Sequence, residues 1–99
     1  MSEEELDDYE ATLELALVQE YKAVLGMFSY AIETDRRFYL ANDVAIEVKG
    51  TSTPTLLEVT LTDAWVWDMY RAARFVPSVR VLTFRDVNVE RLPINELQP

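Results

Sequence analysis

The chain has 99 residues and a formal net charge of -9, with 49% hydrophobic and 27% charged residues. These values are typical of one soluble domain. The acidic balance disfavours binding to nucleic acid and to anionic lipid, which a negative protein field repels. The sequence contains no cysteine and no histidine, which excludes a disulfide framework and removes the most common proton shuttle and zinc ligand. We therefore expect no enzymatic activity, no cofactor and no metal site.

The N-terminal residues bear on localisation. They read Met-Ser-Glu-Glu-Glu, whereas a secretory signal begins with a basic region. No apolar run approaches the roughly 20 residues that a membrane span requires. The sequence therefore predicts a cytoplasmic protein without membrane contact.

Residues 2–26 are predicted to form one helix. Ser2 followed by Glu5 is the capping-box pattern of a helix start, and Gly26 is a common stop signal. Leu15 lies opposite the apolar face of this helix. That face is one stripe of side chains at three- to four-residue spacing or its multiples: Leu6, Leu13, Leu17, Tyr21 and Val24, with Tyr9 and Ala16 beside it.

Charge is distributed unevenly along the chain. Residues 1–20 contain eight acids and no base, whereas residues 71–91 contain five arginines. We favour the interpretation that the acidic helix covers the arginine-bearing segment within one fold. The alternatives are that the acidic face is simply solvated, that it docks a basic partner, or that it mimics nucleic-acid phosphate.

From Phe28 onward the apolar period changes from 3.6 to 2, which predicts antiparallel strands joined by hairpins. Asp35-Arg36 and Arg85-Asp86 are predicted turns, residues 50–54 form the clearest loop, and Asn42-Asp43 indicates a bulge or a tight turn. The candidate strands cover residues 28–33, 38–49, 57–62, 79–84 and 87–90.

These elements predict an α+β fold. One long N-terminal amphipathic helix packs on an antiparallel sheet of four to five strands. Residues 1–92 are expected to form a single domain, and residues 93–99, which include two prolines, a loosely ordered C-terminal tail.

The segment 62–75 holds both tryptophans and two arginines, and its conformation has two interpretations. Strand alternation places Trp65 and Trp67 on one face, whereas helical geometry separates them. We favour a strand that leads into a short helix or loop. Because Trp, Tyr and Arg dominate binding hot spots, the predicted binding residues are Trp65, Trp67, Asp68, Tyr70, Arg71, Arg74 and Phe75. The alternative is that these rings fill the core, above all Trp65 and Phe75.

Several runs of the sequence carry a resemblance to a known family. They are residues 19–22, 28–30, 36–42, 63–71, 73–76 and 83–88, and residues 63–71 contain the double-tryptophan motif. Across them the chain resembles a small acidic actinobacterial family known only as a domain of unknown function. The gene of that family commonly lies beside that of a type II ribonuclease H. The resemblance implies no activity. The family has a proline where this chain has Ala72, which leaves open whether a helix continues past Arg71.

The function predicted from these patterns is a non-enzymatic module that binds a protein partner through an aromatic/arginine surface. The alternative is a nucleic-acid-associated accessory protein, such as the partner of a nuclease. A metal-dependent nuclease is the third hypothesis. In it, Glu47 and either Asp35 or Asp43 would coordinate a magnesium ion, and Lys49 would position the attacking water. An exposed strand edge with alternating charges explains the same pattern.

Overall fold

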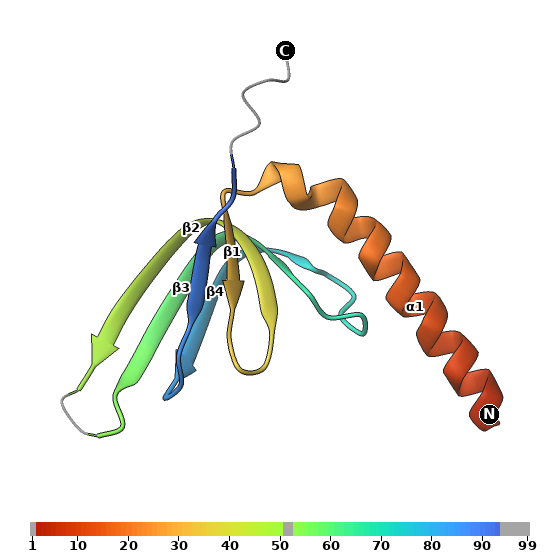
Figure 1. Cartoon of the computed structure of the whole chain (residues 1–99), viewed down its shortest axis with the longest axis horizontal. Helices are drawn as coiled ribbons and strands as arrows, with labels where there is room; N and C mark the ends of the chain where they lie inside the picture. Colours follow the sequence, from red (N-terminus) through yellow and green to blue (C-terminus); the bar gives the residue numbers. More distant parts are fainter. Residues whose placement is uncertain (1, 51–52, 94–99) are drawn as a thin grey trace, which may run out of the picture.

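One helix leads into one sheet (Figure 1) in the computed structural model, which describes residues 2–50 and 53–93. The helix α1 (Glu3–Val24) continues through a 3-10 turn, η1 (Leu25–Met27). The predicted capping box is confirmed. The Ser2 hydroxyl accepts a hydrogen bond from the Glu5 amide at 3.2 Å, and the Glu5 carboxylate accepts one from the Ser2 amide at 3.3 Å. The α-helix ends at Val24, and Gly26 lies within η1.

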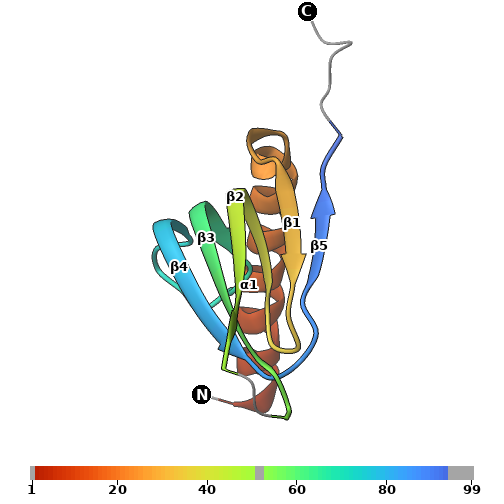
Figure 2. The ribbon, with the colours of Figure 1, turned by 90° about the vertical axis from the view of Figure 1, so that its left-hand side faces the viewer.

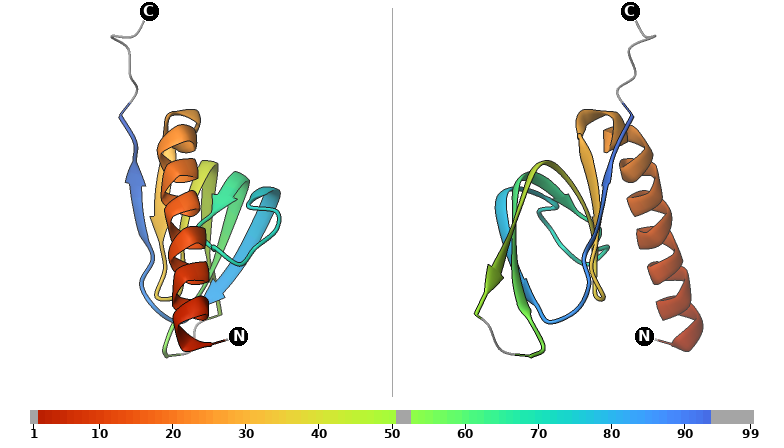
Figure 3. Two further views of the ribbon diagram at one scale, coloured as in Figure 1. Left: turned by 90° about the vertical axis from the view of Figure 1, so that its right-hand side faces the viewer. Right: turned by 60° about the vertical axis from the view of Figure 1, so that its left-hand side comes forward.

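The sheet has five antiparallel strands, which confirms the predicted fold class. They are β1 (Tyr30–Glu33), β2 (Phe38–Lys49), β3 (Leu56–Val66), β4 (Phe75–Thr83) and β5 (Asn88–Arg91). Their order is β4-β3-β2-β1-β5, so the last strand pairs with the first (Figure 2). The helix lies on one side of this sheet (Figure 3). Between β2 and β3, Leu40 stands opposite Trp65, and on β4 Phe75 stands opposite Trp65.

The sheet bends where β2 passes Asn42. Ala41 and Val44 contribute to the same core cluster although they are three residues apart, so the alternation of side chains shifts by one here. Opposite Asn42, Asp63 on β3 has a φ of 54°, the left-handed region that Asp and Asn tolerate best among residues with a side chain. The Asn42 side-chain amide donates to the Asp63 carboxylate at 2.6 Å. The predicted interruption at Asn42-Asp43 is therefore a bend in a continuous strand, and the tight turn is not formed.

Two core clusters lie on opposite faces of the bent sheet. The cluster on the face away from α1 is aliphatic apart from Tyr39 and includes Ile32, Val59 and Leu61, which are all fully buried. The cluster under α1 joins Leu17 and Val24 of the helix to residues of the sheet and of the turn before it: Phe28, Leu40 and Trp65.

Only the C-terminal half of α1 packs on the sheet. Leu17 and Val24 are its buried residues, whereas Leu6 and Tyr9 are 44% and 52% exposed. Towards its N-terminus the helix runs away from the strands (Figure 1). The radius of gyration of 16.1 Å consequently exceeds the value of about 13 Å expected for a compact chain of this length.

The structure also decides the conformation of residues 62–75. Strand β3 continues to Val66, an irregular loop follows, and β4 begins at Phe75 with Pro77 inside it. The helical interpretation was wrong, and the strand-then-loop interpretation is confirmed. Of the predicted tail, residues 94–99 lie outside the described residues. None of the helices in the described ranges is both long enough and apolar enough to cross a bilayer.

Candidate protein-binding surface

Trp65 occupies the point where α1 meets the sheet. Its side chain is 0% exposed, and the ring N–H donates a hydrogen bond to the Glu20 carboxylate at 2.6 Å. The ring of Trp67 lies edge-on to that of Trp65, with centroids 5.8 Å apart, so both indoles share one face of the strand as alternation predicted. Because Trp65 is sealed under the helix, it supports the candidate surface without being available to a partner.

The Glu20 carboxylate links the helix to Trp65 on β3 and to Arg74 in the loop before β4. Arg74 donates to it through Nε at 2.6 Å and through a second, very short bond from the guanidinium terminus. The hydrogen bond from Arg74 lowers the pKa of Glu20 against the opposing effect of burial, and the bond from Trp65 lowers it further. Glu20 in turn raises the pKa of Arg74. The pair is therefore charged at neutral pH and fixes the C-terminal half of α1 to the loop before β4.

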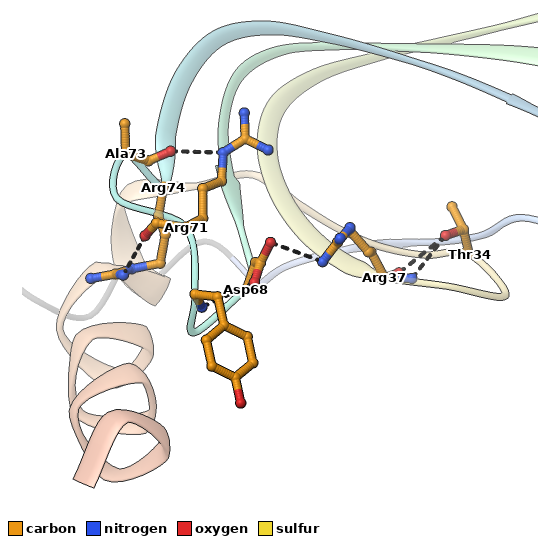
Figure 4. Close-up of polar contacts among 7 residues, drawn as sticks. Thr34, Arg37, Asp68, Arg71, Ala73 and Arg74 are labelled. Carbon is orange, nitrogen blue, oxygen red and sulfur yellow. Dashed lines mark hydrogen bonds and ion pairs between the residues drawn. The ribbon is translucent and has the colours of Figure 1, made fainter. Parts of the chain in front are cut away.

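The loop between β3 and β4 is held mostly by its own polar groups (Figure 4). The Asp68 carboxylate pairs with Arg37 at 3.1 Å and accepts a bond from the Tyr70 amide at 3.1 Å. The Arg71 Nε donates to the Ala73 carbonyl at 2.8 Å, and Arg74 donates to the Arg71 carbonyl at 3.0 Å. Asp68 and Arg74 are therefore committed to shaping the loop, while the rest of the Arg71 guanidinium is exposed.

Tyr70 stands near the tip of this loop and is 64% exposed. Partial desolvation, and after it the nearby Glu10 carboxylate, raise the pKa of the Tyr70 hydroxyl. The loop extends from the end of β3 towards α1 (Figure 1).

Three aromatic rings from different elements line an open hollow of about 350 Å³. Tyr21 comes from α1, Phe38 from the start of β2 and Trp67 from the start of the loop after β3. The Tyr21 and Trp67 rings are 5.2 Å apart and the Phe38 and Trp67 rings 6.1 Å apart, both edge to face. The surface of this aromatic hollow is predominantly apolar. The sequence pattern predicted Tyr21 on the apolar face of the helix and Phe38 in a strand, and neither pattern states how far the sheet extends under the helix.

Phe75 lies apart from the aromatic hollow, at the first position of β4. It stacks on Phe28 with ring centroids 6.4 Å apart and remains 51% exposed. Of the predicted binding residues, the structure therefore brings Trp67 and Tyr70 to the surface near the helix. Arg71 is exposed in the loop with its guanidinium directed away from the helix (Figure 4), and Phe75 lies on the β4 edge.

The acidic helix covers only one of the five C-terminal arginines. Arg74 pairs with Glu20, whereas Arg80 lies 3.8 Å from Glu58 on the neighbouring strand and Arg85 lies 3.5 Å from Asp35. Among the described residues, the remaining carboxylates of α1 form no ion pair with a basic side chain: Glu3, Glu4, Glu5, Asp7, Asp8, Glu10 and Glu14.

The residues of the nuclease interpretation do not converge. Glu47 and Lys49 form an exposed pair with a distance of 3.4 Å, on the part of β2 that β1 does not cover. Asp35 lies in the turn before β2, beyond the opposite end of the strand, and pairs with Arg85. Asp43 is four residues from Glu47 on an extended strand, which separates them by about 13 Å. Residues 2–50 and 53–93 contain no cluster of three acidic, His or Cys side chains with the geometry of a metal site.

Comparison with known proteins places the chain in a family. The family described as "Protein of unknown function (DUF2469)" matches residues 1–99. The chain belongs to this family. It is 54% identical over 98 residues to uncharacterised proteins of Mycobacterium bovis and Mycobacterium tuberculosis, with 99% of this chain and 97% of each relative covered. No solved structure matches the chain at a significant level. The expected relationship to an actinobacterial family of unknown function is confirmed.

Proposed function

We propose that this DUF2469 protein is a cytoplasmic, non-enzymatic interaction module that binds a protein partner through the surface around residues 65–75. One observation carries the proposal: the rings of Tyr21, Phe38 and Trp67 line an open apolar hollow that no other described element covers. Large apolar surfaces left open on small domains are typical of interaction sites. A hollow lined by rings is suited to receive an apolar anchor from a partner.

The residues around the hollow divide between support and contact. Trp65, Asp68 and Arg74 are engaged in internal hydrogen bonds and fix the loop. Within that loop, Tyr70 and Arg71 are exposed and Trp67, its first residue, is half-buried. Trp, Tyr and Arg are the residue types most enriched in binding hot spots, and a loop that is ordered before binding loses little entropy when it binds.

The composition supports contact over chemistry. With no histidine and no cysteine, the chain lacks the most common neutral-pH general base and has no thiolate nucleophile. Glu20, which precedes Tyr21 in α1, is held charged by Arg74, and a lowered pKa is unsuited to proton transfer at neutral pH.

Affinity capture from native lysate tests the proposal, with the intact chain as bait and Trp67→Ala as the disrupting variant. Removing this ring takes away part of the hollow, so we expect one stoichiometric partner with the intact chain and about tenfold less of it with the variant. Val48→Ala is the matched control, because Val48 is exposed near the opposite end of β2 from Phe38. The far-UV circular dichroism of both variants should match that of the intact chain. Absence of any stoichiometric partner, or equal losses with both variants, would contradict the proposal.

A further inference from the structure

An uncovered apolar stripe lies along the free half of α1 (residues 3–14), also called the arm, on the N-terminal side of the aromatic hollow. Leu6, Tyr9 and Leu13, here called the free stripe, follow the helical spacing of Leu17, which is 3% exposed against the sheet. Leu6 and Tyr9 are about half exposed, and Leu13 is half-buried. From Leu6 to Tyr21 the helix rises about 22 Å. The free stripe and the hollow lie along the same helix, with the buried Leu17 between them, and form the two ends of one candidate site.

The free half of the helix is stabilised locally, without the sheet. An isolated helix of this length is marginal in water, and here the capping box and the acids Glu3 and Glu4 in the first turn favour it. The side chains of Ser2 and Glu5 accept hydrogen bonds from two backbone N–H groups that would otherwise lack partners at the helix start. The apolar face of the arm is therefore already helical without a partner.

Charge decides which kind of partner fits this site. The arm carries seven carboxylates that form no ion pair among the described residues, and residues 1–20 contain no base. A second copy of the chain would bring an equally acidic arm and be repelled. Nucleic acid and anionic membranes are repelled for the same reason. A basic partner gains attraction along the whole arm and is steered towards it during encounter.

We propose that the free stripe and the aromatic hollow together receive an amphipathic helix of another protein, whose apolar face is flanked by lysine or arginine. The inference rests on the proposed function and names the chemistry of its partner. An apolar helix face laid into a groove, with anchors spaced by three or four residues, is a recurring mode of recognition. A partner helix of about 15 residues matches the length of the site. Its basic flanks face the carboxylates of the arm.

Two fluorescein-labelled peptides test this partner chemistry by fluorescence anisotropy with the full chain. Both are amphipathic helices of about 18 residues with the same leucine and phenylalanine face, flanked by lysine in one peptide and by glutamate in the other. We expect the lysine peptide to bind at least about tenfold more tightly, and to lose about tenfold in affinity when NaCl rises from about 0.05 M to about 0.5 M. Equal binding of the two peptides would overturn the inference.

Matched leucine variants locate the bound peptide on the helix. Leu6→Ala combined with Leu13→Ala should weaken the lysine peptide about tenfold, because both side chains lie in the free stripe. Leu15→Ala should leave its affinity unchanged, since Leu15 is 59% exposed on the opposite face. Alanine preserves the helix, so the loss reports contact and not unfolding. Equal effects of the two sets would show that the peptide does not occupy the site.

The outcomes separate this inference from the proposed function. If a protein partner is captured through Trp67 but the lysine peptide is not preferred, the proposed function stands. The inference of a basic partner helix is then wrong. A chain that captures no partner at all rejects both. Analytical ultracentrifugation tests whether the stripe binds a second copy of the chain. A dimer that dissociates when Leu6→Ala and Leu13→Ala are combined would show this and would overturn the inference.

Discussion

The two halves of α1 carry the same apolar stripe and meet different surroundings. In the C-terminal half, Leu17 and Val24 are buried on the sheet, and Glu20 is bound by Trp65 and Arg74. In the N-terminal half, Leu6 and Tyr9 repeat the same spacing and remain about half exposed. The apolar stripe alone therefore does not tell whether a residue is buried. The sheet of this chain packs on the stripe in the C-terminal half of α1, and the N-terminal half remains exposed.

The largest effect should separate Leu17 from Leu6. Leu17→Ala removes a side chain that is 3% exposed, so we expect it to lower the free energy of unfolding by about 2–5 kcal/mol. Leu6→Ala truncates an exposed side chain and should change that free energy by less than about 0.5 kcal/mol. Urea denaturation of both variants measures the difference. Similar losses would mean that the free half of α1 packs on the fold in solution.

Glu20→Gln should have the next largest effect. The change removes the carboxylate charge and one of the two oxygens that accept from Arg74, and it weakens the bond from Trp65, which should cost about 1–3 kcal/mol at neutral pH. Because the pKa of Glu20 is lowered in the folded chain, its carboxylate stabilises the fold above the unfolded pKa of about 4.3. That contribution is lost as the pH falls through the lower folded value.

Urea denaturation of the native and Glu20→Gln chains across a pH series measures this dependence. The difference between the two should be largest at neutral pH and should shrink below about pH 4.3. Glu14→Gln is a suitable control, because Glu14 lies in the free half of α1 and has no ion pair in the described residues. A difference independent of pH would indicate that Glu20 acts by packing alone.

Ser2→Ala should have the smallest effect on global stability and a distinct local one. Loss of an N-cap costs a helix about 1 kcal/mol, but the first turns of α1 touch little else. We therefore expect faster amide hydrogen exchange in the N-terminal half of α1, with the global free energy of unfolding within about 0.5 kcal/mol of the native value. An equal rise of exchange in the C-terminal half would contradict the division of the helix.

Local patterns were sufficient to predict most of the fold. The Ser2 and Glu5 pair defined the helix start, and period-two alternation located all five strands because each depends on neighbours in sequence. The double-tryptophan segment could not be settled in this way, since Trp65 and Trp67 fit both a strand and a helical turn. The segment forms a strand through pairing with distant residues, since Trp65 stands opposite Leu40 on β2.

The aromatic hollow was beyond sequence reasoning for a related reason. Tyr21 belongs to the helix stripe and Phe38 to a strand, and each is an ordinary core residue in its own element. They line an open surface only because α1, the start of β2 and the residue after β3 meet there. That meeting is a property of long-range packing, which no local period encodes.

The backbone at Asp63 bears on how the double-tryptophan motif should be interpreted. Its first residue adopts a φ of 54°, which Asn, Asp and Gly reach at the least energetic cost. Asp63 therefore fits the chain geometry, and its carboxylate also accepts the hydrogen bond from Asn42 across the bend. A sequence with Asn at this position would retain both the backbone conformation and a side-chain acceptor, whereas Gly would retain the conformation alone.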